Sequence, residues 1–270
     1  MNLFVSESAL RLGVFVGLFL LFAGLETLAP RRKRSFPRRT RWTTHFVITL
    51  LNTLTLRIVA IALPLLAIGA ALDAAALGVG LFNWLTLPAW FEAIAAVIVF
   101  DLAIWAQHLL SHKVPLFWRF HRMHHADPDL DVTTAIRFHP IEIATSMVLK
   151  IGLVYLLGPS IWAVLFFEIL LNGTALFNHA NLRLPPRLDA ALRLILVTPD
   201  MHRVHHSVER AEHDSNYGFA LSIWDRVFGT YTAQPLAGHD GMEIGLQWRD
   251  QSPTRLIWSL KLPFLRSKRP

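Results

Sequence analysis

The 270-residue chain is long enough for one large domain or two small ones, and 53% of its residues are hydrophobic against 17% charged. This balance excludes an ordinary soluble globular domain. The absence of cysteine from the sequence excludes disulfide bonds, thiolate-held iron–sulfur clusters and cysteine-rich zinc sites. The net charge of +7 does not indicate nucleic-acid binding, because the basic residues concentrate at 31–41 and 255–269 beside apolar runs. That arrangement is typical of contact with anionic lipid headgroups.

The first hundred residues contain three apolar stretches that can each cross a bilayer as a helix. They run from Ser8 to Ala29, from Phe46 to Leu72 and from about Pro88 to His108. A cleaved signal peptide is the alternative for the first stretch, but its positive charges would precede the apolar residues. Here seven basic residues follow, at 31–41. They predict a cytoplasmic position for this segment, and also for the polar chain after the third crossing.

Two further apolar stretches, Ile141–Leu157 and Ile161–Phe177, are separated by Gly-Pro-Ser, which is a turn signal. We expect them to form a hairpin that enters the membrane and returns to the side from which it started. His139 and His179, at its two ends, would then lie at matching depth. The sequence therefore predicts an all-α, polytopic membrane protein with a cytoplasmic helical cap.

Histidines at helical spacing are concentrated on the predicted cytoplasmic side. The motif His-x-x-His-His occurs at 121–125 and 202–206, and positions i, i+3 and i+4 share a helix face. Thr198, Pro199 and Asp200 have the pattern of a helix start just before the second motif. Neutral imidazole is the commonest protein ligand for transition metals. The candidate ligands are His108, His112, His121, His124, His125, His139, His179, His202, His205 and His206.

Ten imidazoles exceed what one metal ion binds, since a tetrahedral zinc takes four ligands. They suit two ions, each with four or five nitrogen ligands and an open position. The carboxylate-rich di-iron sites of helical bundles use a Glu-x-x-His pair, which does not occur in the sequence. Ligand softness and geometry favour iron, with manganese, zinc or copper as alternatives.

The segments HLLSH, HRMHH, RFHP, NHAN, TPDMHRVHH and NYGFALSIWDRVFGTY occur in this order between Asp101 and Tyr231. Together they resemble the fatty acid hydroxylase/sterol desaturase superfamily of integral-membrane di-iron oxidases. The resemblance implies an O2-dependent oxidoreductase with two iron ions that hydroxylates a lipid, such as a fatty acyl chain or a sterol. Lipid desaturation and ether-lipid monooxygenation are the alternatives. The resemblance also implies that both His-x-x-His-His sets, His108, His112 and His179 are ligands, and His139 matches a recurrent His-Pro position.

Each turnover of such an oxidase requires two electrons, yet the sequence contains no Gly-x-Gly-x-x-Gly fingerprint for a nucleotide cofactor. We therefore expect an external electron donor, of ferredoxin or cytochrome type, to bind the cytoplasmic face. Arginines next to the histidine motifs are the candidate docking residues: Arg119, Arg122 and Arg203.

Three polar residues are candidates for orienting ligand imidazoles. Asp101 lies on the helix face of His108, and an ion pair with Arg57 is its alternative role. Asn181 and Asp200 have turn and helix-cap roles as alternatives. Three histidines fall outside the motifs and are expected to be solvated at the surface: His45, His213 and His239.

We divide the chain into N-terminal transmembrane helices at 1–107 and a histidine-rich catalytic region at 108–270, within one structural domain. Lys150 and Glu168 are expected to pair across the hairpin, and 244–265 would lie on the membrane surface or form a solvated tail. A metal transporter is an alternative function, but it would place its histidines mid-bilayer rather than at helix ends. A transmembrane haem protein would have no use for adjacent histidines.

Overall fold

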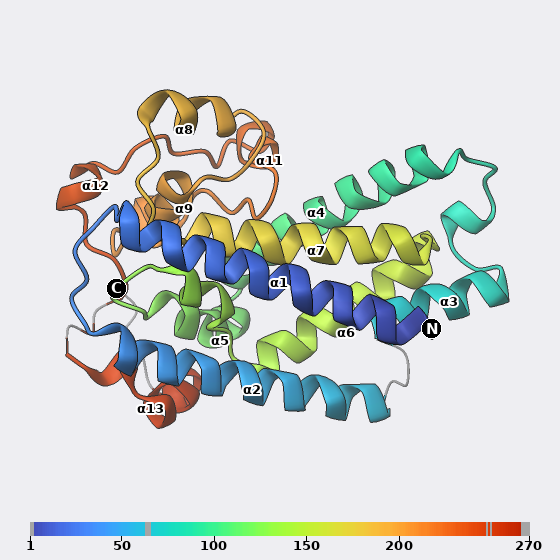
Figure 1. The fold of residues 1–270 in the computed structure, drawn as a ribbon, viewed down its shortest axis with the longest axis horizontal. Coiled ribbons are helices and arrows are strands. Elements are labelled where there is room, and N and C mark those ends of the chain that lie inside the picture. Colours follow the sequence, from blue (N-terminus) through green and yellow to red (C-terminus); the bar gives the residue numbers. More distant parts are fainter. Residues whose placement is uncertain (1–2, 63–65, 247, 249, 266–270) are drawn as a thin grey trace.

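The computed structural model describes residues 3–62, 66–246, 248 and 250–265. Within these residues, five helices are long and apolar enough to cross a membrane. They lie side by side along the long axis of the molecule (Figure 1): α1 (Leu3–Leu28), α2 (Arg38–Ala62), α4 (Ala89–Lys113), α6 (Pro140–Leu157) and α7 (Ile161–His179). Only isolated β-bridges accompany the helices in the described part of the chain, so the all-α prediction is confirmed.

The second crossing differs from its prediction. It starts at Arg38, eight residues before Phe46, because Arg41 is buried in an ion-pair network and extends the helix toward the basic segment. Its predicted end at Leu72 belongs to a separate short helix, α3 (Ala67–Leu77). The residues between these two helices, 63–65, lie outside the described residues.

The two helices of the predicted hairpin form, and a turn of three residues joins them. Helix α6 ends at Gly158, whose φ of 63° is left-handed, a conformation that glycine adopts at low cost. The Ser160 hydroxyl then caps α7 by accepting a hydrogen bond from the Ala163 N–H. The expected pair also forms across the hairpin, with Lys150 Nζ 2.8 Å from Glu168 Oε1.

The shorter helices gather at one end of the long bundle, and α3 lies at the other (Figure 1). The connection between α1 and α2, which carries the basic residues 31–34, lies at the same end as these shorter helices. The α-helices of this group are α5 (Pro115–His125), α8 (Pro186–Leu192), α9 (Pro199–His205), α10 (Arg210–His213), α11 (Ile223–Val227), α12 (Gly238–Gly241) and α13 (Leu256–Lys261). Among the described residues, the 3-10 helices are η1 (Leu81–Asn83), η2 (Val132–Ile136), η3 (Ser252–Thr254) and η4 (Leu262–Phe264).

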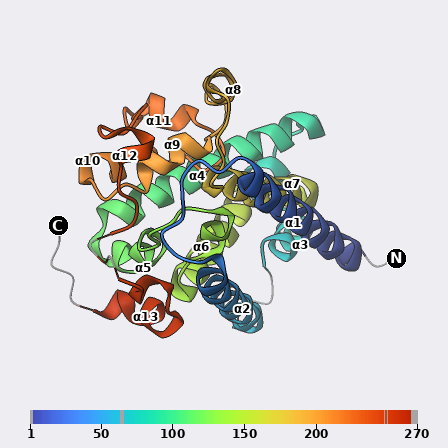
Figure 2. The same ribbon diagram turned by 60° about the vertical axis from the view of Figure 1, so that its left-hand side comes forward.

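The C-terminal segment packs against the protein, which corrects the alternative of a solvated tail at 244–265; its position on the membrane surface stays a prediction. Helix α13 lies beside α2 and η4 packs on α5 (Figure 2), and Leu262 is buried with Ile48 and Met123. The Arg122 guanidinium donates to the carbonyl of Leu265 at 2.7 Å. Residues 247 and 249 of this segment lie outside the described residues.

Candidate metal centre

Nine of the ten predicted ligands lie in two groups, and within each group the ligand atoms are all within 4.8 Å of one another. The histidines come from α4, α5, α7 and α9, with His206 directly after α9, and these helices meet at one end of the bundle. The first group contains His108, His112, His121, His125 and His205; the second contains His124, His179, His202 and His206.

Each His-x-x-His-His motif contributes to both groups. In α5, His121 and His125 are four residues apart and belong to the first group, whereas His124 points to the second. At α9 the arrangement is reversed, because His202 and His206 belong to the second group and His205 belongs to the first. Adjacent histidines project about 100° apart on a helix, so one motif supplies two neighbouring sites.

In the first group, two ring nitrogens approach each other without a proton to share. His108 Nδ1 lies 2.8 Å from the carbonyl oxygen of Tyr217, and His121 Nδ1 lies 2.7 Å from Glu142 Oε1. Both oxygens accept hydrogen bonds, so each neutral ring carries its proton on Nδ1 and a lone pair on Nε2. The two Nε2 atoms are 3.1 Å apart. Opposed lone pairs at this distance fit a cation between or beside them.

The second group repeats this arrangement. His179 Nδ1 lies 2.8 Å from the Ala175 carbonyl oxygen, which leaves a lone pair on His179 Nε2. That atom lies 3.1 Å from His124 Nε2 and 3.0 Å from His202 Nε2. The Nδ1 atoms of His124 and His202 are buried and have no hydrogen-bond partner in the described part of the chain.

Burial favours the neutral form of an imidazole, which is the form that binds a metal. Burial, followed by the neighbouring histidines, lowers the pKa well below the ordinary value of 6.5 for the histidines outside the membrane-crossing helices: His124, His125, His202, His205 and His206. The nine clustered imidazoles form an all-nitrogen donor set, which suits iron, zinc or copper.

The family model described as fatty acid hydroxylase matches residues 93–230, which include both groups of histidines. The chain belongs to this family. The family assignment agrees with the resemblance that the sequence motifs carry, and with the five membrane-length helices it identifies a multi-pass integral membrane protein.

Several curated proteins are similar to this fatty acid hydroxylase family member. Alkylglycerol monooxygenase of Homo sapiens is 35% identical over 160 residues, covering 57% of this chain and 33% of the relative. Ornithine lipid hydroxylase OlsE of Rhizobium tropici is 32% identical over 148 residues, covering 55% of this chain and 44% of the relative. The cholesterol 25-hydroxylase-like protein of Danio rerio is 27% identical over 146 residues, covering 52% of this chain and 55% of the relative. The matched region thus spans a third to about half of each relative's length, and no solved structure matches the chain.

The tenth candidate, His139, lies in neither group of this family member. Its Nδ1 accepts a hydrogen bond from the Ile141 N–H at 3.2 Å, which caps the start of α6. Its Nε2 lies 3.3 Å from the carbonyl oxygen of Leu260. Both ring nitrogens therefore contact protein backbone, an arrangement typical of a helix cap.

The three candidates for orienting imidazoles contact other groups. Asp101 accepts hydrogen bonds from Trp224 Nε1 at 2.8 Å and from the N–H groups of Ala220 and Leu221. It thus holds the chain near Tyr217, whose carbonyl binds His108, and its bonds are to this loop rather than to Arg57.

Asn181 and Asp200, the other two candidates, both contact the basic segment between α1 and α2. Asn181 pairs with the backbone of Arg32, and Asp200 forms ion pairs with Arg31 and Arg203.

Two functional candidates were missed in the sequence. Glu142 contacts His121, and His213 lies with its ring centroid 5.2 Å from that of His112. The position of Glu142 in the first turn of the helix opened by His139 and Pro140 was an available signal. His213 offered none, because its proximity to the site depends on how α10 packs.

The expectation of solvated surface positions for the three remaining histidines is wrong. His45 is buried, and its Nδ1 lies 2.8 Å from Thr133 Oγ1. His239 is buried, and its Nε2 lies 3.7 Å from Asp200 Oδ2. His213 is also buried and packs on Trp118, with ring centroids 4.9 Å apart. Tertiary packing encloses these residues although no motif surrounds them.

We expect the metal-free protein to lose stability as the pH falls from about 6.5 to about 4. Burial lowers the pKa of His213 and of His239 to about 4, against 6.5 in the unfolded chain. Between these values the unfolded chain binds protons that the folded protein does not, so acid favours unfolding. Thermal unfolding in detergent across this range should show a falling midpoint. His239→Gln should weaken the dependence, and a pH-independent midpoint would contradict the expectation.

Two of the three proposed docking arginines are buried, which corrects their assignment. Arg122 donates to the backbone carbonyls of the C-terminal segment, and Arg203 pairs with Asp200. Arg119 alone of the three is exposed. These two arginines bond backbone and carboxylate groups inside the protein and are not available to an external protein.

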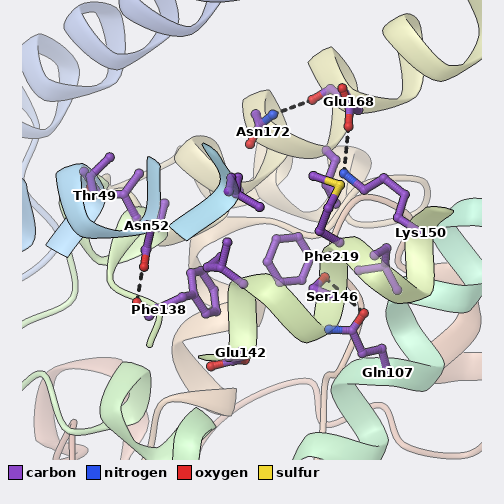
Figure 3. Close-up of a pocket in the computed structure, with 18 of the residues that line it drawn as sticks. Thr49, Asn52, Gln107, Phe138, Glu142, Ser146, Lys150, Glu168, Asn172 and Phe219 are labelled. Carbon is purple, nitrogen blue, oxygen red and sulfur yellow. Dashed lines mark hydrogen bonds and ion pairs between the residues drawn. The ribbon is translucent and has the colours of Figure 1, made fainter. Parts of the chain in front are cut away.

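A cavity of about 360 Å³ is lined by residues of the first histidine group and of the membrane-crossing helices. Figure 3 shows part of this lining, including Asn52 of α2, Lys150 of α6 and Glu168 of α7. His108, His121 and Glu142 belong to its lining, and so does Lys150, which lies about 15 Å along α6 from its first residue. A second cavity of about 400 Å³, mostly apolar, lies among α4, α5 and α6 and shares Gln107, Ser111 and Glu142 with the first. Such volumes beside a membrane suit a lipid chain.

Proposed function

We propose that this protein is an O2-dependent di-iron oxidoreductase that hydroxylates a lipid. The observation that carries the proposal is the opposition of unprotonated Nε2 atoms in two adjacent groups, with the first group in the wall of a cavity inside the membrane bundle. Membership of the fatty acid hydroxylase family supports it, as do relatives named as lipid hydroxylases and as an alkylglycerol monooxygenase. Ether-lipid cleavage and desaturation are second candidates.

The two histidine groups would hold the irons, which supply the oxidising power that side chains lack. The protein's own groups set the geometry of this site. The carbonyls of Tyr217, Ala175 and Ser215 and the carboxylate of Glu142 accept the Nδ1 protons and thereby aim the Nε2 lone pairs. The cavity holds a lipid chain against the first group and excludes bulk water from the reacting carbon.

The basic residues at 31–41 support a cytoplasmic position for the histidine end of the bundle. There an external donor would deliver the electrons. Exposed Arg119 follows Trp118, whose ring centroid lies 5.1 Å from that of His112 and 5.5 Å from that of His125. This adjacency supports docking of an acidic donor protein near Arg119.

Replacing Glu142 with alanine should lower metal affinity about 10- to 100-fold, because outer partners of metal-binding histidines contribute effects of this size. Glu142→Gln should retain much of the affinity, since an amide oxygen still accepts the His121 Nδ1 proton. Metal titration of the purified variants measures the difference. Equal losses of metal affinity in the two variants would contradict a role for Glu142 as the acceptor of the His121 Nδ1 proton.

Reversing the charge at Arg119 (Arg119→Glu) should slow electron transfer from an acidic donor about tenfold or more at low salt, with metal content unchanged. Arg187→Glu, an exposed arginine on α8, is the matched control and should leave the rate unchanged. Stopped-flow reduction of the iron-loaded protein reports the rate. Equal rates for the two variants would remove the docking proposal.

Expression in a bacterial host, followed by mass spectrometry of its lipids, tests the proposed function. A lipid that gains one oxygen atom with the wild-type protein, but not with His202→Ala, supports hydroxylation. Loss of two hydrogens would instead identify a desaturase, and release of an aldehyde from an ether lipid would identify an ether-cleaving monooxygenase. No lipid change with a fully iron-loaded protein and a competent electron donor would contradict all three.

A further inference from the structure

Helix α2 forms one wall of the 360 Å³ cavity, and this wall carries a row of hydrogen-bond acceptors. Thr49, Asn52 and Thr53 are spaced i, i+3 and i+4, share one helix face and line the cavity. The Thr49 hydroxyl donates to the His45 carbonyl at 2.9 Å, and the Thr53 hydroxyl donates to the Thr49 carbonyl at 3.0 Å. Because their protons are used within the helix, these hydroxyls offer the cavity only oxygen lone pairs.

Asn52 supplies the decisive acceptor. Its side-chain Nδ2 donates to the Phe138 carbonyl at 3.1 Å, which fixes the orientation of the amide. Its Oδ1 is buried and has no hydrogen-bond partner among the described residues, and the residue is only 8% exposed. Figure 3 shows this bond to Phe138 at the edge of the cavity. A buried acceptor without a donor is unfavourable, so this oxygen points to a ligand that brings a proton.

A second acceptor lies on α6. Glu142 Oε1 is bound to His121, but Glu142 Oε2 is buried without a partner among the described residues, and the residue belongs to the same cavity lining. Acceptors on α2 and α6 thus line the same cavity as His108 and His121 of the first histidine group. A plain hydrocarbon would leave both oxygens without a proton to accept.

We infer that the lipid substrate carries a free hydroxyl group and that Asn52 Oδ1 selects it by accepting a hydrogen bond. The inference rests on the proposed function and names the class of lipid that the cavity takes. A site built to bond a substrate hydroxyl discriminates strongly against an analogue that lacks it, because the buried acceptor is then left unpaired. Asn52 is a specificity residue in this account.

Equilibrium binding to the purified protein tests the inference without turnover. The probes are a 1-O-alkylglycerol and the same lipid with both hydroxyls methylated, each competing with the radiolabelled diol. Wild type should bind the free diol about tenfold more tightly than the methylated lipid. Asn52→Leu should reduce this ratio to about twofold or less. Asn172→Leu should keep it, since Asn172 lines the same cavity but bonds its own helix at the Glu168 carbonyl.

Equal binding of the two lipids by wild type would overturn the inference, as would an undiminished ratio in Asn52→Leu. Metal content and thermal unfolding show whether Asn52→Leu folds, and if it does not, the wild-type ratio decides alone. Lipid oxidation without a hydroxyl preference would overturn the inference and leave the proposed function standing. A hydroxyl preference in an iron-loaded protein that oxidises no lipid would support selective binding and contradict the proposed function.

Discussion

Replacing His124 with alanine should abolish lipid oxidation, with a fall of at least about 100-fold, and should lower the metal content of the purified protein. His124 Nε2 lies 3.1 Å from His179 Nε2, and the side chain is fully enclosed. The substitution leaves three imidazoles in the second group, and alanine cannot supply the missing lone pair. Metal analysis of the purified variant and mass spectrometry of its lipid products measure the two effects.

His139→Ala is the matched control, because His139 is the predicted ligand that lies outside both groups. It should keep the full metal content and lose only about 1 kcal/mol of stability through the lost cap of α6. Equal metal loss in the two variants would contradict the division of the histidines described above. Unchanged metal content in His124→Ala would contradict the metal centre itself.

Replacing Arg41 with alanine should destabilise the fold by about 3–5 kcal/mol, as expected when one partner of a buried ion pair is removed. The Arg41 guanidinium is fully buried and donates to both carboxylate oxygens of Asp127, at 2.9 and 2.6 Å. It also pairs with buried Asp131. Burial alone raises the pKa of the Asp127 carboxyl, but Arg41 holds this pKa well below its usual range, so alanine would leave two buried carboxylates uncompensated.

Arg39→Ala, two residues away on the exposed side of the same helix, should change stability by less than about 0.5 kcal/mol. Chemical unfolding in detergent compares the two variants. Asp127 follows His124 and His125 closely in the chain, so Arg41→Ala should also weaken metal binding. Similar stabilities for the two variants would show that the buried network contributes little to the fold.

The structure also explains why the role of Arg41 was not predicted. It lies in the basic run at 31–41, where charge counting indicates contact with lipid headgroups. Its partners Asp127 and Asp131 are about 90 residues away in the sequence, and no local pattern connects them. Ion pairs between distant segments depend on packing, which periodicity does not report.

The histidine sites likewise combine features that local spacing predicts with features that depend on packing. Spacing within α5 and α9 showed that the histidines of each motif share a surface, because a helix repeats every 3.6 residues. Their allocation to two groups depends on how four helices meet. The exclusion of His139 and the approach of His213 and Glu142 depend on this packing too.

The sequence by itself determined the membrane-length helices, the turn between the last two of them and the histidine motifs, since hydropathy and helical spacing are local properties of the chain. Only the tertiary structure decided which histidines face one another, which charges are buried in pairs, and that Asn52 presents an unpaired oxygen to the cavity. These features arise where segments distant in sequence converge, and their energies depend on burial and distance rather than on residue order.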